Sequence, residues 1–222
     1  MPTKLFISPS DLTFGFSGCH RCLWLKYNLG VTAPMTMPLV RTLSELQESR
    51  FRSAATAEMS RALAAGTVVS AGAWVQSTPI VIDGTPTQFR IRGKYDLLVQ
   101  FDDGTHGVID CKVSGSPDDK ADFYRPQLEA YAFALESPEN GDAKRISTTG
   151  LLVWTPSGVT GDAANGYGFA VDAFWQPIAR QPERLHDLLR DFIAVISTEQ
   201  PPQIKDGCRD CGYVKARTDA GL

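Results

Sequence analysis

Residues 107–114 read GVIDCKVS, a run with the length and composition of a buried strand that nevertheless carries two charges. Side chains alternate across a strand, so Asp110 and Lys112 lie on the same face. Burying either charge alone is costly unless the charge finds a partner or a metal ion. The pair therefore indicates a polar site built into a sheet.

The preceding segment, RIRGKYDLLVQF (residues 90–101), has the pattern of a second strand and is joined to the first by the turn DDG. If this turn has three residues, Asp96 lies directly opposite Asp110. Gly104 suits the left-handed position that closes such a hairpin, whereas a two-residue loop would turn Asp96 to the other face. Opposite residues in a ladder have Cβ atoms about 4.5–5.5 Å apart, so the two carboxylates predict a cation between them.

Carboxylate and carbonyl oxygens suit Mg²⁺ or Mn²⁺, which makes Asp96 and Asp110 candidate ligands of one of these ions. Lys112 would then lie beside the metal, where an ammonium group can orient a water or steady negative charge developing on a phosphate. The alternative interpretation is structural: both aspartates would form an ion-pair network with Lys94 and Lys112.

Around this hairpin the sequence predicts further helices and strands. RTLSELQESRFRSAATAEMSRALAAG (41–66) is rich in helix formers and predicts one long helix ending at Gly66. Alternating or apolar runs predict strands within residues 73–82, 147–156 and 166–175, and amphipathic patterns predict helices at 123–136 and 182–196. This order predicts an α/β fold, with a central mixed sheet flanked by helices, in a single domain spanning residues 1–222.

The composition is that of an ordinary globular protein, with 43% hydrophobic and 21% charged residues. No apolar run approaches the roughly 18 residues of a membrane-spanning helix, and the first ten residues lack the apolar stretch of a signal peptide. We therefore expect a cytoplasmic protein with no membrane partner. The net charge is −3, but residues 1–94 carry 10 basic and 5 acidic residues, and residues 95–222 carry 12 and 20.

Three sequence elements resemble the PD-(D/E)XK nuclease superfamily in its RecB-like branch, which has Gly-x-x-Asp, then Asp-x-Lys, then Gln-x-x-x-Tyr on the following helix. Here these elements are Gly93 and Asp96, Asp110 and Lys112, and Gln127 and Tyr131. The resemblance implies a restriction-endonuclease-like core and a divalent-metal-dependent deoxyribonuclease. It also implies catalytic roles for Asp96, Asp110, Lys112, Gln127 and Tyr131, with the last two sharing a helix face that closes over the site.

The sequence departs from the family's pattern at two points. Tyr95 stands at the position of the proline in the superfamily's name, as is common in this branch. The acidic ligand usually found on an early helix has no motif here; Glu45 and Glu48 are candidates, and exposed glutamates without such a role are the alternative. We select Glu48 as the third metal ligand.

Four of the five cysteines form two C-x-x-C pairs, Cys19 with Cys22 and Cys208 with Cys211. Four thiolates are the number needed for tetrahedral Zn²⁺ or for a [4Fe–4S] cluster, and such a site would clasp the two termini together. Separate redox motifs or unrelated free thiols are the alternatives. The fifth, Cys111, faces away from the charged pair and is expected to be a small buried hydrophobe.

Several members of the RecB-like branch, including the CRISPR-adaptation nucleases, tie their termini together with an iron–sulfur cluster. This resemblance favours [4Fe–4S] over Zn²⁺. Those proteins usually carry one cysteine near the start and three near the end, whereas this chain has two and two, which keeps Zn²⁺ as a rival.

These observations predict a metal-dependent DNA nuclease of DNA repair, recombination or defence. The negative net charge favours DNA delivered by a guide or a protein partner over a tight non-specific grip. The alternatives are a non-cleaving nucleic-acid-binding or scaffold subunit that keeps the fold, and a thiol oxidoreductase based on C-x-x-C. The intact Asp96, Asp110 and Lys112 argue against the first, and the lack of a thioredoxin-like βαβ context argues against the second. Trp24, Trp154 and Trp175 are interpreted as packing residues.

Overall fold

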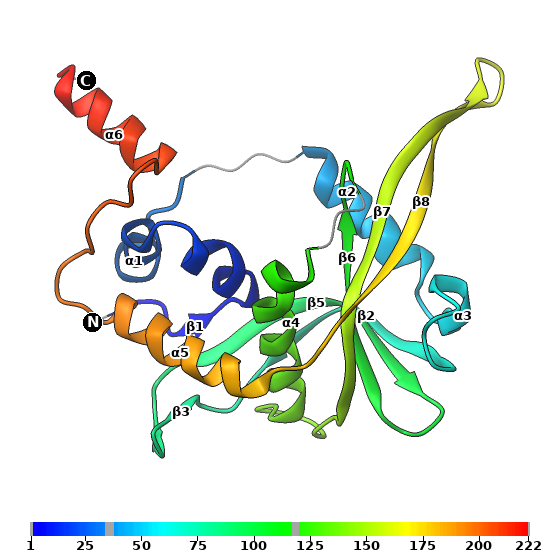
Figure 1. Cartoon of the computed structure of the whole chain (residues 1–222), viewed down its shortest axis with the longest axis horizontal. Helices are drawn as coiled ribbons and strands as arrows, with labels where there is room; N and C mark the ends of the chain where they lie inside the picture. The colour runs from blue at the N-terminus through cyan, green and yellow to red at the C-terminus, as the bar shows by residue number, and fades with distance from the viewer. Residues whose placement is uncertain (1, 34–37, 117–119, 222) are drawn as a thin grey trace.

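The computed structural model describes residues 2–33, 38–116 and 120–221. Its centre is a six-stranded sheet in which β5 pairs with β6, β6 with β7 and β7 with β8, while β1 and β2 both pair with β5 (Figure 1). The strands are β1 (Phe6–Ile7), β2 (Gly66–Gln76), β5 (Arg90–Phe101), β6 (His106–Val113), β7 (Ile146–Asp162) and β8 (Gly166–Ile178). The β1–β5 and β6–β7 pairs are parallel and the others antiparallel, so the predicted mixed sheet is confirmed.

Helices cover both faces of this sheet. They are α1 (His20–Leu29), α2 (Pro38–Arg50), α3 (Thr56–Met59), α4 (Ala121–Glu136), α5 (Pro182–Ile196) and α6 (Arg209–Asp219), with a π-helical turn at Asp11–Gly15. The larger hydrophobic core lies between the sheet and α1, α4 and α5. A smaller core lies on the other face, beneath the chain that joins α2 to α3. None of the described helices has the length and apolar character needed to cross a membrane.

The prediction of one long helix over residues 41–66 was wrong. Helix α2 ends at Arg50, and Ser53 has a φ of 60°, a left-handed conformation that interrupts the helix. The turn buries Phe51 in the smaller core, where it is 5% exposed. Burial of this side chain therefore overrides the helix propensity of the surrounding residues.

The glycine expected to end that helix instead begins strand β2. A Cβ atom on Gly66 would lie 2.4 Å from the carbonyl oxygen of Gln100 on β5. Only glycine permits this close approach of the two backbones.

Strands β7 and β8 form a hairpin that is longer than the predicted segments. Their pairing continues to Asp162 opposite Gly166, and the far part of the hairpin extends away from the body of the molecule (Figure 1). A separate two-stranded sheet pairs β3 (Val81–Ile82) with β4 (Thr85–Pro86). The strand predicted within residues 73–82 is accordingly split between β2 and β3.

Candidate active site and cysteine centre

The β5–β6 hairpin has the three-residue turn and the register that the sequence predicts. Gly104 has a φ of 81°, the left-handed conformation expected at the end of such a turn. The ladder runs to Leu97 opposite Ile109. The next step along both strands places Asp96 opposite Asp110.

The buried Asp110 and the partly buried Lys112 form an ion pair on β6. Asp110 is 2% exposed, and its Oδ2 atom lies 2.5 Å from Nζ of Lys112. Burial opposes the charge of Lys112, but the carboxylates of Asp110 and Asp96 outweigh it and raise the pKa of Lys112. The ammonium group also lies 4.9 Å from the ring centroid of Tyr124. Lys112 is therefore held as a cation at this site.

The carboxylate of Asp96 is fixed at the point where the β5–β6 ladder ends. Its Oδ2 atom accepts a hydrogen bond of 2.7 Å from the backbone N–H of Cys111. Burial and the adjacent charge of Asp110 hold the pKa of Asp96 well above its usual range. The two aspartates thus repel each other, and a bound cation would relieve that repulsion.

Glu48 on α2 lies close to these carboxylates, whereas Glu45 does not. Glu48 is 8% exposed, and its negative charge contributes to the raised pKa of Asp96. Its Oε2 atom is 3.1 Å from Nζ of Lys94. Glu45 is exposed and pairs with Arg41 at 2.8 Å.

Gly72 on β2 leaves the space that Glu48 occupies. Its φ is 62°, and a Cβ atom there would lie 2.5 Å from Oε2 of Glu48. Sequence reasoning missed this residue, although a glycine inside an alternating strand is a known signal for a bulge or a close approach.

Helix α4 contributes two side chains from one face. Nε2 of Gln127 donates a hydrogen bond of 2.9 Å to Oδ1 of Asp110. The hydroxyl of Tyr131 donates one of 2.6 Å to the carbonyl of Lys94. A Cβ atom on Gly93 would lie 3.0 Å from the Tyr131 ring, so the glycine of the Gly-x-x-Asp element permits the helix to pack closely on β5.

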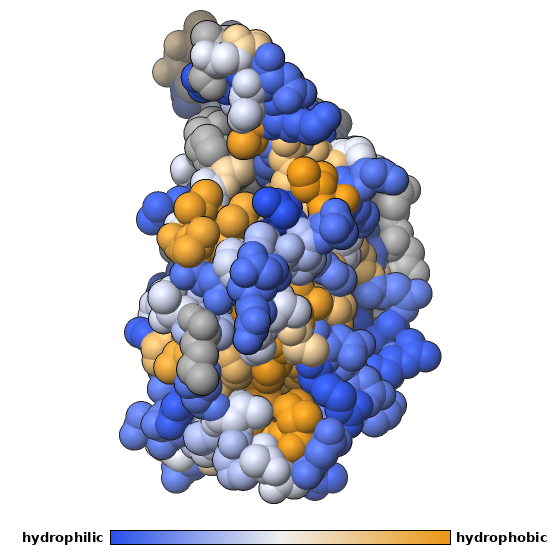
Figure 2. Space-filling view, turned by 90° about the vertical axis from the view of Figure 1, so that its left-hand side faces the viewer, coloured by the Kyte–Doolittle hydropathy of each residue, from blue (hydrophilic) through white to orange (hydrophobic). Residues whose placement is uncertain are grey.

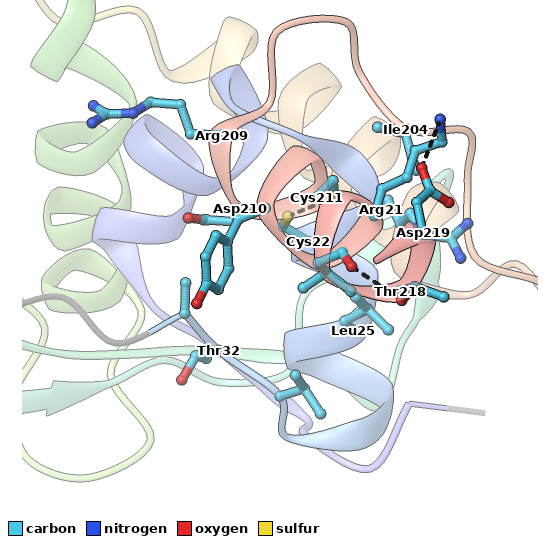
Figure 3. Close-up of a pocket in the computed structure, with 15 residues that line it drawn as sticks. Arg21, Cys22, Leu25, Thr32, Ile204, Arg209, Asp210, Cys211, Thr218 and Asp219 are labelled. Carbon is cyan, nitrogen blue, oxygen red and sulfur yellow. Dashed lines mark hydrogen bonds and ion pairs between the residues drawn. The ribbon is translucent and has the colours of Figure 1, made fainter. Parts of the chain in front are cut away.

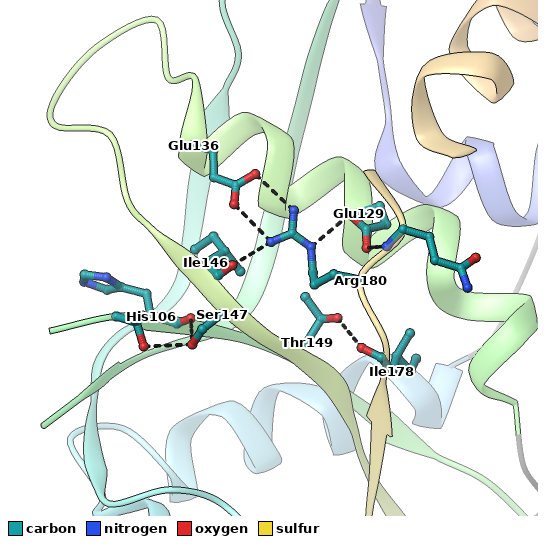
Figure 4. A network of polar contacts seen from close by, with 10 residues as sticks. His106, Glu129, Glu136, Ile146, Ser147, Thr149, Ile178 and Arg180 are labelled. Carbon is teal, nitrogen blue, oxygen red and sulfur yellow. Dashed lines mark hydrogen bonds and ion pairs between the residues drawn. The ribbon is translucent and has the colours of Figure 1, made fainter. Parts of the chain in front are cut away.

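A partly buried ion-pair network anchors α4 to the segment between β8 and α5 (Figure 4). Nε of Arg180 lies 2.9 Å from Glu129, and its other nitrogens lie 3.0 Å from both carboxylate oxygens of Glu136. Glu129 is 2% exposed and also accepts a bond of 2.6 Å from the backbone N–H of Gln181. Since Glu129 lies between Gln127 and Tyr131 in the helix, the network fixes the helix turn that faces the site. No motif marks these residues in the sequence.

The carboxylate cluster has the chemistry of a divalent-cation site. Glu48, Asp96 and Asp110 supply oxygen donors, which suit Mg²⁺ and Mn²⁺. The buried Oε1 atom of Gln127 has no hydrogen-bond partner among the described residues. Donor type, excess negative charge and this unpartnered acceptor therefore all fit a hydrated cation.

The two cysteine pairs meet in space, as predicted. The Sγ atoms of Cys19, Cys22, Cys208 and Cys211 all lie within 4.8 Å of one another. Each pair starts at a helix N-terminus, because Cys19 precedes α1 and Cys208 precedes α6. Burial would raise the pKa of Cys19, but hydrogen bonds from the backbone of Lys205 and neighbouring residues lower it to about 6. Cys19 can therefore supply a thiolate to a metal ion.

Cys111 lies apart from this centre, as expected. It is 2% exposed and packs in the smaller core with Leu97 and Ile109. It therefore faces away from Asp110 and Lys112.

A cavity of about 890 Å³ lies beside the cysteine centre, between α1 and α6 (Figure 3). Cys22 and Cys211 line it together with apolar side chains that include Leu25 and Ile204. None of its lining residues belongs to the carboxylate cluster. Figure 2 faces this end of the molecule and shows hydrophobic residues in separate patches among hydrophilic ones.

Comparisons with known proteins agree with this architecture. A model of the PD-(D/E)XK nuclease superfamily matches residues 16–216. No curated protein matches the sequence. Among matching solved structures, the one titled "Crystal structure of SSO0001" has a TM-score of 0.54 and 15% sequence identity, with 97% of this chain and 87% of that chain covered. At this identity the likeness shows a shared fold.

Proposed function

The chain belongs to the PD-(D/E)XK nuclease superfamily, and from this premise we propose that it is a divalent-metal-dependent deoxyribonuclease. One observation carries the proposal. Nζ of Lys112 lies 2.5 Å from the carboxylate of the buried Asp110, and the backbone N–H of the next residue, Cys111, donates a hydrogen bond to Asp96. A structural ion pair needs neither the second aspartate nor Glu48 beside it. The surplus of carboxylates supports a metal site over the purely structural alternative.

In this proposal Asp96, Asp110 and Glu48 hold one Mg²⁺ or Mn²⁺, which when bound polarises a phosphate oxygen and acidifies a water. Lys112 orients the attacking water and stabilises the negative charge that develops on the phosphate. Gln127 holds the Asp110 carboxylate in place through its 2.9 Å hydrogen bond. Tyr131 keeps α4 packed against β5 through its bond to the Lys94 carbonyl.

The test is a cleavage assay on single-stranded, duplex and branched DNA with Mg²⁺ or Mn²⁺, with and without chelator. We expect wild-type protein to cleave at least one form, and chelator or the Asp110→Asn change to abolish cleavage. DNA binding without cleavage under every condition would favour the non-cleaving scaffold subunit instead. Roles in DNA repair, recombination or defence, and delivery of DNA by a protein partner, belong to the same proposal.

We further propose that the four thiolates hold one metal centre rather than two redox pairs. Their convergence from both ends of the chain supports this over a thiol oxidoreductase. Three of the Sγ–Sγ distances are 3.4 Å for Cys22 to Cys211, 3.7 Å for Cys22 to Cys208 and 3.9 Å for Cys19 to Cys211.

These distances bear on the choice between Zn²⁺ and [4Fe–4S]. Sulfurs around one tetrahedral ion with bonds of about 2.3 Å lie about 3.8 Å apart. A four-iron cluster holds its thiolates further apart, because the iron atoms lie between them. The spacing supports Zn²⁺ and the family resemblance supports the cluster. Metal analysis with an absorbance spectrum of anaerobically purified protein decides between them.

A further inference from the structure

Trp74 is an exposed aromatic residue in the middle of strand β2. Its relative exposure is 68%, and it pairs with Lys94 on β5. Tryptophan is highly buried on average in folded proteins, so this exposed indole leaves an unusually large apolar surface open to a ligand. The sequence offers no warning of this, because Trp74 occupies an ordinary alternating position.

A cation covers one face of the Trp74 ring. The guanidinium carbon of Arg92 lies 5.5 Å from the centroid of Trp74 and 5.1 Å from that of Phe6. The three side chains form a stacked arrangement in which arginine lies against two aromatic rings. Arginine thus supports the indole ring on one side and leaves its other face for a ligand.

Arg92 gives this surface a positive charge, whereas the charge of Lys94 is offset by Glu48 at 3.1 Å. Within the part of the chain that the structure describes, no carboxylate lies at ion-pair distance from Arg92. The nearby Glu139 is bound by Arg90 at 2.9 Å and by Gln76 at 2.5 Å, which offsets its charge.

The surface is continuous with the candidate active site. Lys94 lies opposite Trp74, and its side chain, 42% exposed, reaches Glu48 at 3.1 Å. The carbonyl of the same residue accepts the hydrogen bond from Tyr131. A strand of nucleic acid bound at the carboxylates would therefore pass over Lys94 to reach Trp74.

We propose that Trp74, Arg92 and Lys94 form a binding subsite for an unpaired nucleotide of single-stranded DNA. The free face of Trp74 stacks on a base and Arg92 neutralises an adjacent phosphate, while Lys94, which is paired with Glu48, lies along the path of the strand. Only an unpaired base exposes a face to an external ring, because the bases of a duplex are covered by their neighbours. The substrate class rests on the proposed nuclease function, while the subsite itself rests on the geometry of β2 and β5.

Fluorescence anisotropy with fluorescein-labelled oligothymidine, measured in chelator so that nothing is cleaved, tests the subsite apart from the activity. Trp74→Ala should weaken binding about 5- to 100-fold, the loss of one stacked base. Trp74→Phe should retain most of the affinity. Tyr167→Ala, which removes a 73% exposed aromatic from the β7–β8 hairpin, should change nothing.

Two further probes separate stacking from charge. An abasic oligonucleotide should bind wild-type protein more weakly than oligothymidine does. The Trp74→Ala protein should bind the two oligonucleotides with equal affinity. Arg92→Gln should flatten the salt dependence of binding, since one fewer counterion is released.

The two proposals fail in different ways. Trp74→Ala with wild-type affinity for oligothymidine would overturn the subsite, even if cleavage persists. Absence of metal-dependent cleavage, with the tryptophan-dependent affinity intact, would overturn the nuclease and support the subsite. Equal affinity of wild-type protein for abasic and intact strands would overturn the stacking role.

Discussion

The carboxylate of Asp96 accepts a 2.7 Å hydrogen bond from the backbone N–H of Cys111, the residue that follows Asp110. The side chain of Asp96 on β5 thus accepts a hydrogen bond from the backbone of β6 just beyond the last backbone-paired residues of the two strands. This bond fixes an acidic group beside a second one, and the pKa of Asp96 rises through burial and the charge of Asp110.

We predict that Asp96→Asn stabilises the metal-free protein near neutral pH. Because the folded-state pKa of Asp96 is raised, the folded protein binds this proton more tightly than the unfolded chain, where aspartate has a pKa of about 3.9. The stabilisation is complete below the unfolded pKa and is lost as pH rises through the folded pKa. Asparagine mimics the protonated form and can still accept the Cys111 bond.

The measurement is the free energy of unfolding in chelator, followed from about pH 4 upward for both proteins. The wild-type value should fall relative to that of Asp96→Asn as pH rises. Mn²⁺ should then stabilise only the wild type. Parallel pH profiles would show that Asp96 titrates normally in the folded protein.

Lys112→Met should reduce the cleavage rate about 100-fold or more, because it removes the cation that faces the developing charge. It also leaves Asp110, 2% exposed, without its ion-pair partner, so stability should fall in chelator and recover with Mn²⁺. Lys120→Met is the control: Lys120 bonds Ser114 at 2.6 Å, outside the carboxylate cluster. Equal rates for the two variants would remove Lys112 from the mechanism.

Local signals explain which features the sequence predicts. The hairpin register follows from the DDG turn and the two-residue period of β5 and β6, both readable over a short window. The cysteine centre could be predicted because two C-x-x-C pairs supply the four thiolates that one metal site needs. The end of α2 cannot be predicted from its local sequence, because it depends on the burial of Phe51 in a core built from strands that are distant in the sequence. The partners Arg180 and Glu129 are 51 residues apart and carry no motif.

Gly72→Ala should damage the site through geometry alone. A φ of 62° costs a non-glycine residue about 1–2 kcal/mol, and the new Cβ would collide with Glu48 at 2.5 Å. We expect weaker Mn²⁺ binding by calorimetry together with a lower Tm. Gly158→Ala is the matched change, since a Cβ there meets nothing within 4 Å. Unchanged Mn²⁺ affinity in Gly72→Ala would exclude Glu48 as a ligand.

Arg180→Met should cost about 3–5 kcal/mol, since it leaves the carboxylate of Glu129 buried without its partner. Adding Glu129→Gln should recover part of this loss, because the uncompensated charge disappears. Arg190→Met removes a more exposed arginine paired with Asp83 and Asp187 and should cost far less than Arg180→Met. Chemical denaturation of the four proteins measures these differences; similar losses for both arginines would refute the anchoring role.

The last prediction concerns Cys208, which should stabilise both ends of the chain through the cysteine centre. The C-terminal segment has few buried side chains of its own; Cys211 is the one buried residue of α6. Binding of a metal by groups from two segments contributes directly to folding free energy. Cys208→Ser should therefore lower stability well beyond a surface substitution and increase hydrogen exchange in α1 as well as α6.

Cys111→Ser makes the same chemical change in the smaller core and should leave the metal content unaltered. Metal analysis of the three proteins, together with hydrogen exchange, therefore distinguishes loss of a ligand from general loosening. Exchange that increases in α6 while α1 stays protected would mean that the two cysteine pairs do not share a metal. A full metal complement in Cys208→Ser would contradict the four-thiolate centre, because a three-thiolate site should bind more weakly.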